Sequence, residues 1–182
     1  MRIVAGSRKG ARIYAPPGRD TRPTGDRVRE AAFNLIGPGR VEGATVLDLF
    51  AGSGAMGLEA LSRGAAQAVF VESDRDACRA INRNLDKLGL ASATVLCQDV
   101  LGALRTDAAM GKRYDLVLVD PPYEMFSSLQ NELIPYLPEV LDPEGLLVVE
   151  TAARAEPELP LAKRTSRRYG AARLSLFEHE HA

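Results

Sequence analysis

The sequence predicts an α/β fold built on a doubly wound, mostly parallel, Rossmann-like sheet of seven strands. From residue 44 onward, short apolar segments alternate with segments of helical periodicity. The apolar segments are continuous runs, which is typical of parallel strands buried on both faces. The repeated order of strand and helix indicates a doubly wound sheet. A chain of 182 residues is long enough for one such domain with a small extension.

Residues 1–23 are expected to form a small β-hairpin extension and a linker, ahead of a main domain at residues 24–182. The segments "RIVA" and "ARIYA" are separated by "GSRKG", which is a hairpin signal. The following "PPGRDTRPTG" is too rich in proline and glycine for a helix or a central strand. A helix is predicted in "DRVREAAFNLI", with Thr24 or Asp26 as its cap. Its apolar face would consist of Val28, Ala31, Ala32, Leu35 and Ile36.

The main domain is expected to contain five parallel strands followed by a hairpin. The parallel strands are predicted in "TVLDLF", "QAVFVE", "ATVLC", "YDLVLVD" and "GLLVVET". Helices are predicted between them, at about residues 55–63, 74–88, 99–109 and 126–140. The end of the chain differs, because "KRTSRRYG" and "ARLSLFEHE" are strand-like and meet at Tyr169-Gly170. This pattern predicts an antiparallel hairpin at one sheet edge.

Composition and cysteine content indicate a soluble, cytoplasmic protein. Hydrophobic residues make up 46% of the chain and charged residues 26%. No apolar run reaches the ~18 residues of a membrane helix, and the start of the chain does not resemble a secretory signal. Cys78 and Cys97 show neither CxxC spacing nor a neighbouring histidine cluster. We therefore expect no disulfide framework and no zinc site, and a reducing compartment.

Positive charge gathers at the two ends of the chain. Residues 1–30 hold eight arginines and lysines against three acids, and residues 159–182 hold five against two. Residues 31–158 hold ten against nineteen. The ends are either solvated arms or a surface for RNA or DNA formed where they meet. The second interpretation predicts phosphate contacts from Arg8, Lys9, Arg22, Arg27, Arg167 and Arg168. Arg29 could instead serve an ion pair within its helix.

A glycine loop follows the first parallel strand and opens a helix. In "DLFAGSGAMGLEAL", Gly52, Gly54 and Gly57 match GxGxxG, and Glu72 ends the next strand about twenty residues later. The match is formally the dinucleotide-binding fingerprint, with the acid placed to hold a ribose hydroxyl. The alternative is a tight strand-to-helix turn whose glycines serve only close packing.

Asp48 favours S-adenosylmethionine over NAD as the cofactor. A carboxylate just before the loop would repel a pyrophosphate, whereas it would attract the ammonium and sulfonium groups of S-adenosylmethionine. Glu72 would then accept from the ribose hydroxyls and Asp99 from the adenine amine, beside Val100. Asp99 could equally be a helix N-cap. The predicted cofactor-binding residues are Asp48, Phe50, Gly52, Ser53, Gly54, Glu72, Asp99 and Val100.

These motifs together resemble those of class I methyltransferases that modify exocyclic amines. The resemblance rests on "LDLFAGSGAMGLEALSRGA", "VFVESD" and "DPPY". With "RIVAGSRKGARI", "TRPTGDRVREAAFNLI" and "SLFE", nearly the whole chain is similar to the bacterial 16S ribosomal RNA guanine-N2 methyltransferase family. Gly25 and Met56 are small departures from its usual pattern. The resemblance implies methylation of guanine N2 in small-subunit RNA, late in assembly and bound to protein.

The tetrapeptide "DPPY", Asp120 to Tyr123, has the composition of a clamp for a planar amine. The lone pair of a base amine is delocalised into the ring, so the amine is a poor nucleophile. The Asp120 carboxylate and the Pro121 carbonyl could accept from its two N–H groups, with Pro122 adding rigidity. Tyr123 could stack on an extruded base. The alternative is a proline-stiffened turn after a strand.

Other functions share some of these motifs. An adenine-N6 methyltransferase acting on DNA or RNA would share "DPPY", and only the wider resemblance separates the two. Enzymes that methylate protein glutamine usually have "NPPY" in place of "DPPY". Asp48 argues against an NAD-dependent dehydrogenase. The intact "DPPY" argues against a non-catalytic RNA-binding module. His179 and His181 lie in a terminal tail, so no metal is expected. A monomer is the default expectation.

Overall fold

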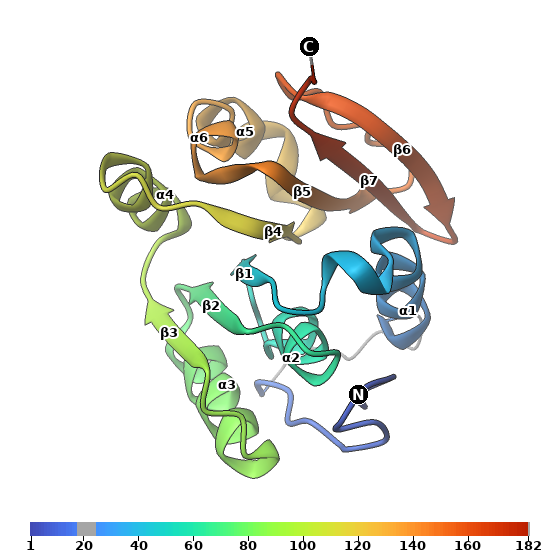
Figure 1. The fold of residues 1–182 in the computed structure, drawn as a ribbon, viewed down its shortest axis with the longest axis vertical. Helices are drawn as coiled ribbons and strands as arrows, with labels where there is room; N and C mark the ends of the chain where they lie inside the picture. The colour runs from blue at the N-terminus through green and yellow to red at the C-terminus, as the bar shows by residue number, and fades with distance from the viewer. Residues whose placement is uncertain (18–24, 182) are drawn as a thin grey trace.

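In the computed structural model, which describes residues 1–17 and 25–181, a sheet of seven strands runs through the molecule (Figure 1). The strand order is β3-β2-β1-β4-β5-β7-β6. The first five strands are parallel, and β7 is antiparallel to both β5 and β6. The strands are β1 (Thr45–Leu49), β2 (Gln67–Glu72), β3 (Ala93–Cys97), β4 (Tyr114–Val119), β5 (Leu141–Ala152), β6 (Ala162–Tyr169) and β7 (Ala172–Glu178). The predicted doubly wound fold is confirmed.

Helices cover both faces of this sheet. One face packs against α1 (Gly25–Ile36), α2 (Ala55–Ser62) and α3 (Arg75–Leu88). The other face packs against α4 (Val100–Ala109), α5 (Tyr123–Leu133) and α6 (Leu137–Val140). A short 3-10 helix, η1 (Pro38–Arg40), joins α1 to the first strand. None of the helices in the described part of the chain is long and apolar enough to cross a membrane.

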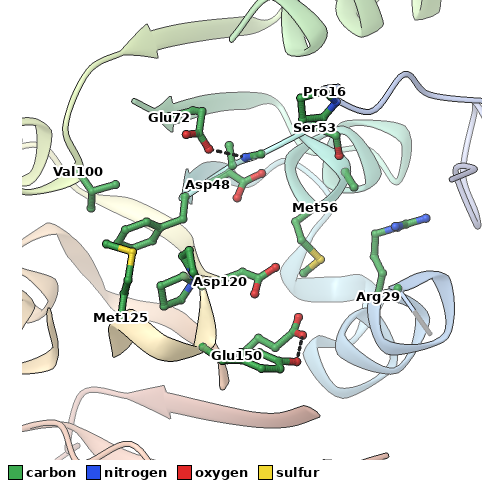
Figure 2. A pocket seen from close by; sticks show the side chains of 18 of the residues that line it. Pro16, Arg29, Asp48, Ser53, Met56, Glu72, Val100, Asp120, Met125 and Glu150 are labelled. Atoms are coloured by element: carbon green, nitrogen blue, oxygen red, sulfur yellow. Dashed lines mark hydrogen bonds between the residues drawn. The ribbon is translucent and has the colours of Figure 1, made fainter. Parts of the chain in front are cut away.

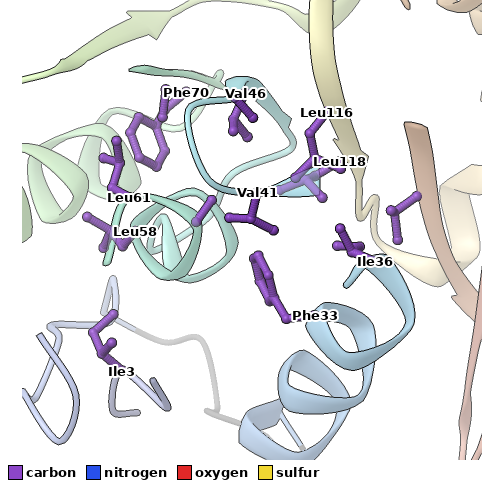
Figure 3. Packing of buried hydrophobic residues seen from close by; sticks show 14 of the residues in the cluster. Ile3, Phe33, Ile36, Val41, Val46, Leu58, Leu61, Phe70, Leu116 and Leu118 are labelled. Atoms are coloured by element: carbon purple, nitrogen blue, oxygen red, sulfur yellow. The ribbon is translucent and has the colours of Figure 1, made fainter. Parts of the chain in front are cut away.

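The central strands are apolar on both sides because both sides are covered. In β1, Val46 faces the α1–α3 layer and Leu47 faces the α4–α6 layer, and both are 1% exposed. Figure 3 shows the first of these layers, where Phe33 of α1 and Leu58 of α2 pack beneath the sheet. Ile3, from the start of the chain, lies in the same cluster.

The N-terminal segment packs against the domain with little β-structure of its own. Arg2 and Arg12 form an isolated antiparallel bridge where the sequence predicts a hairpin. Ile3 and Ile13 are buried in the core cluster beneath α2. The side chain of Asn84 on α3 accepts from the Tyr14 N–H at 2.6 Å and donates to its carbonyl at 2.9 Å. Glu59 and Ser62 of α2 also accept from backbone N–H groups of this segment, which is therefore held by burial and by side chains of α2 and α3.

The predicted helix at residues 126–140 is two helices. α5 begins at Tyr123, three residues early, and ends at Leu133, and α6 begins at Leu137. Pro135 lies between them and Pro138 in the first turn of α6. A proline has no N–H to donate and its ring clashes with the preceding turn, so the helix cannot continue through this region. The chain then enters β5 at Leu141, four residues before the predicted strand.

The two cysteines are paired, contrary to the expectation from the sequence. Cys78 lies in the first turn of α3 and Cys97 ends β3, and they form a disulfide with their Cα atoms 6.0 Å apart. The strand register explains the proximity, because Glu72, which precedes α3, lies opposite Cys97. The two cysteines are 19 positions apart in the sequence, so their spacing gave no sign of this contact.

Candidate active site

A cavity of about 750 Å³ lies at the carboxyl ends of the central parallel strands (Figure 2). Its position is the point where the strand order reverses between β1 and β4, which is where open α/β sheets bind ligands. All the predicted catalytic and cofactor-binding residues except Gly54 line it. The sequence motifs, which are far apart in the chain, therefore converge on one site.

The glycine loop turns through backbone conformations that suit its glycines. Gly52 and Gly54 have φ angles of 57° and 81°, in the left-handed region that favours glycine. Phe50, which lines the cavity, has φ 58° and is the one non-glycine residue with positive φ in the described chain. A Cβ atom at Gly57 would lie 2.4 Å from the Phe70 ring. Glycine at this position therefore allows α2 to approach β2 closely.

Asp48 lies buried at the base of the cavity. Its side chain is 1% exposed, and Oδ2 accepts a hydrogen bond of 2.9 Å from the Gly57 N–H. Burial raises the pKa of Asp48 to about 8, although the Gly57 N–H opposes this rise, and nearby Glu72 adds to it. A cation bound beside Asp48 would favour its carboxylate form. The buried Asp48 carboxyl group therefore favours the binding of a positively charged ligand in this cavity.

Glu72 holds the loop as well as facing the cavity. It ends β2 and is 6% exposed; Oε2 accepts from the Gly52 N–H at 2.8 Å and Oε1 from the Asp74 N–H at 3.0 Å. Asp99 accepts from the Gly102 N–H at 3.0 Å, so the N-cap alternative is confirmed for α4. Asp99 also lines the cavity, so the same side chain can cap α4 and contact a ligand.

The "DPPY" residues carry the chain from β4 into α5 along the cavity wall. Asp120 directly follows β4, next to β1, where Leu118 pairs with Asp48. Figure 2 shows the carboxyl groups of Asp48 and Asp120 directed into the same space. Pro122 is the N-cap residue of α5, and Tyr123 is its first residue. Asp48 and Asp120 thus lie at the carboxyl ends of two adjacent strands, β1 and β4.

Glu150 is a site residue that the sequence reasoning missed. It lies near the end of β5, lines the cavity, and accepts a hydrogen bond of 3.0 Å from the Tyr123 hydroxyl. The signal was present, because "GLLVVET" places an acid at the same sheet edge as the ends of β1 and β4. Met125 and Arg29 also line the cavity without having been predicted there.

Arg29 is a buried ion-pair residue. It is 3% exposed, donates from Nε to Glu59 at 3.3 Å, and pairs with Asp26 one helical turn earlier at 2.9 Å. It also donates to the Arg2 carbonyl. The pair within α1 that the sequence suggested is therefore present, and Glu59 of α2 extends it.

The residues predicted to contact phosphate separate into two groups. Arg8 is engaged within the fold, because its Nε donates to the Leu88 carbonyl at the end of α3 at 2.6 Å. Lys9 is exposed in the same N-terminal loop, and Arg22 lies outside the described residues. The other group, Arg27 on α1 and the β6 residues Arg167 and Arg168, is exposed.

The elements that carry the second group, α1 and the β6–β7 hairpin, meet beside the cavity. α1 packs on β7 through Val28 and Ala32 against Ala172 and Leu174, and Val28 and Ala172 also line the cavity. Figure 1 shows the N-terminal loop on the far side of α1 from the β6–β7 hairpin. Among the described residues, α1, which carries Arg27, therefore packs against the hairpin, whereas the N-terminal loop lies on its other side.

The fold and the position of its cavity define a class of protein. The S-adenosylmethionine-dependent methyltransferase of Agrobacterium tumefaciens superposes with a TM-score of 0.68 over 87% of this chain and 63% of that chain, at 20% identity. A hypothetical protein of Thermus thermophilus superposes with a TM-score of 0.83 over 98% of this chain and 99% of that chain, at 34% identity. The architecture is that of the class I methyltransferases.

The sequence comparisons narrow the class to a family. The model of the family described as Conserved hypothetical protein 95 matches residues 1–178, and the chain belongs to this family. The ribosomal RNA small subunit methyltransferase D of Escherichia coli K12 is 40% identical over 159 residues, 87% of this chain and 75% of that protein. The protein of that name from Haemophilus influenzae is 37% identical over 155 residues, 83% of this chain and 78% of that protein. These matches confirm the resemblance drawn from the motifs.

Proposed function

We propose that this protein is an enzyme that transfers a methyl group from S-adenosylmethionine to the exocyclic N2 amine of a guanine in small-subunit ribosomal RNA. The observation that carries the proposal is the convergence of Asp48 and Asp120 from adjacent strands into one cavity. One carboxylate suits the positive end of the cofactor and the other a base amine. The identity of 37–40% to small-subunit RNA methyltransferases supports this substrate.

The cofactor residues fit S-adenosylmethionine by charge and by position. Asp48 is buried at the base of the cavity, and burial raises its pKa. The ammonium group of the cofactor would stabilise the ionised form of this carboxyl group. Glu72 and Asp99 line the cavity from the next two strands and would accept from the ribose hydroxyls and the adenine amine. When bound, S-adenosylmethionine supplies an electrophilic methyl group on a positively charged sulfur.

Asp120 and Pro121 would hold and activate the target amine. The Asp120 carboxylate and the Pro121 carbonyl each accept from one N–H, which favours a pyramidal nitrogen whose lone pair can attack. The nitrogen–carbon bond would form as the bond between the methyl carbon and sulfur broke, and the Asp120 carboxylate would take the proton that the nitrogen then released. Orientation of the two reacting groups within one cavity supplies much of the rate. Tyr123 stacks on the base.

The cofactor assignment predicts a specific thermal shift. S-adenosylhomocysteine should raise the melting temperature of the wild-type protein and NAD should not, because only a ligand of the native state stabilises it. Glu72→Ala should weaken the affinity by about 10-fold or more, from the loss of charged hydrogen bonds. Differential scanning fluorimetry across a ligand titration measures both. Glu132→Ala, an exposed glutamate of α5, is the matched control. Stabilisation by NAD alone would contradict the assignment.

RNA binding is predicted to depend steeply on salt. Each phosphate neutralised by Arg27, Arg167 or Arg168 would release counterions, so affinity should fall as salt rises. The double variant Arg167→Ala/Arg168→Ala should bind more weakly and reduce the slope of log K against log salt by about 1 to 2. Filter-binding titrations on the small subunit measure this. Arg113 directly precedes β4, at the end of the strand away from Asp120, and Arg113→Ala should leave the slope unchanged. An affinity of the wild-type protein that does not change with salt would exclude the basic surface.

The identity of the methylated nucleoside shows whether the target base is guanine or adenine. Small subunits that lack the modification, and naked 16S ribosomal RNA, are incubated with labelled S-adenosylmethionine and digested to nucleosides. We expect N2-methylguanosine by mass spectrometry, with more label in the assembled subunit. N6-methyladenosine would replace the proposed function with the adenine alternative.

A further inference from the structure

Glu150 is placed beside Asp120 by the sheet. In the pairing of β4 with β5, Val119 lies opposite Val149, and the next residues along the two strands are Asp120 and Glu150. Both line the cavity, and Figure 2 shows their carboxyl groups directed into it. A base amine held at Asp120 can therefore have a neighbouring ring atom directed to the side where Glu150 lies.

The Tyr123 hydroxyl orients the Glu150 carboxylate. The bond from Tyr123 to Glu150 Oε1 is 3.0 Å long and joins the first residue of α5 to the strand beside it. An ionised carboxylate can accept about four hydrogen bonds, so Glu150 can serve Tyr123 and a donor on the substrate together. Tyr123 could thus stack its ring on a base while its hydroxyl holds Glu150 beside the edge of that base.

The two purines differ in the atom next to the target amine. Guanine carries an N1–H donor beside its N2 amine, whereas adenine carries an unprotonated N1 acceptor beside its N6 amine. A carboxylate at that position would accept from guanine and would repel the lone pair of adenine. Once a bound base covers this carboxylate, an acceptor without a donor is costly, which makes such a contact selective.

We propose that Glu150 is the residue that selects guanine, by accepting a hydrogen bond from N1–H while Asp120 holds the N2 amine. This role rests on the proposed function and deepens it. It assigns Asp120 to the chemistry and Glu150 to the choice of base. The motif "DPPY" alone does not separate guanine from adenine, so the selection must come from a residue outside it.

The test uses 2-aminopurine at the target position of the RNA, found by the nucleoside mapping above. This base keeps the 2-amine but has an unprotonated N1, so it removes the proposed donor and puts an acceptor in its place. The wild-type protein should prefer guanine over 2-aminopurine in kcat/KM. Glu150→Gln should reduce that preference by about 10-fold or more, because its amide can donate to the unprotonated N1.

Controls separate selection from a structural role. Glu124→Gln makes the same change in an exposed glutamate beside Tyr123 and outside the cavity lining, and it should keep the wild-type preference. Tyr123→Phe keeps the ring and removes the hydroxyl, and it should lower the preference less than Glu150→Gln does. Binding of S-adenosylhomocysteine shows that each variant is folded.

The outcomes are distinguishable. If the wild-type protein makes N2-methylguanosine and Glu150→Gln is folded but keeps the wild-type preference, Glu150 does not select the base. If the wild-type protein makes no N2-methylguanosine on any substrate, the proposed function itself is wrong. A smaller preference in Glu150→Gln, with the Glu124→Gln control unchanged, supports the assignment.

Discussion

Replacing Asp120 with alanine is expected to lower kcat by about a hundredfold or more while cofactor affinity stays close to the wild-type value. A positioned polar group that acts on the reacting amine can contribute this much, about 2.7 kcal/mol of barrier. Asp120 follows β4, whereas the loop that would hold the cofactor follows β1, so the loss of Asp120 should not disturb Asp48 or Glu72. Single-turnover methyl transfer on the small subunit, with an independent S-adenosylhomocysteine titration, separates the two quantities.

A matched variant exists in the same strand. Asp115 is an exposed aspartate at the other end of β4, where it accepts from Thr45, and Asp115→Ala should retain wild-type turnover. Asp120→Asn keeps one oxygen acceptor without the charge and should fall between the wild type and Asp120→Ala. Near-normal turnover in a folded Asp120→Ala protein would exclude the proposed amine clamp.

The sheet and its site could be predicted because they depend on local patterns. Continuous apolar runs identify the buried parallel strands, and a polar residue at the end of such a run must lie at the ligand-binding edge. Asp48, Glu72 and Asp120 lie at such strand ends, and the glycine loop and the "DPPY" motif also mark them. Glu150 obeys the same rule and was overlooked because no short motif marks it.

Other features depend on pairing between distant segments. The Cys78–Cys97 disulfide follows from the register of β2 with β3, which the sequence does not specify. The position of the N-terminal segment depends on side chains of α2 and α3 that are not recognisable in advance as its partners. The break between α5 and α6 is different, since Pro135 and Pro138 are visible in the sequence and were overlooked when a single helix was predicted.

Glu59 shows most clearly how distant segments meet. In the sequence it is a glutamate within "GLEAL", and no motif marks it as buried. In the structure it is 0% exposed. Its oxygens accept from the backbone N–H groups of Val4 and Ala5, both at 2.9 Å. They also accept from Arg29 at 3.3 Å and Arg63 at 3.0 Å. One buried carboxylate therefore joins the N-terminal segment, α1 and α2.

This network also shapes the active site. Met1 and Pro16 of the N-terminal segment and Gly25 and Val28 of α1 line the cavity, and Glu59 binds both of these elements to α2. The helix that carries Glu59 begins at the glycine loop. A change at Glu59, which does not line the cavity, should therefore weaken both the fold and the binding of cofactor.

Glu59→Ala is expected to lower the free energy of unfolding by about 3–5 kcal/mol, because it leaves the buried Arg29 charge with fewer partners. In a domain of this size the melting temperature should fall by roughly 10 °C. Urea denaturation followed by circular dichroism measures the loss. Asp26→Ala is the control, since it removes a partly exposed acceptor from the same guanidinium and should cost about 1 kcal/mol or less. Equal stability of Glu59→Ala and Asp26→Ala would show that the buried carboxylate is not what joins these segments.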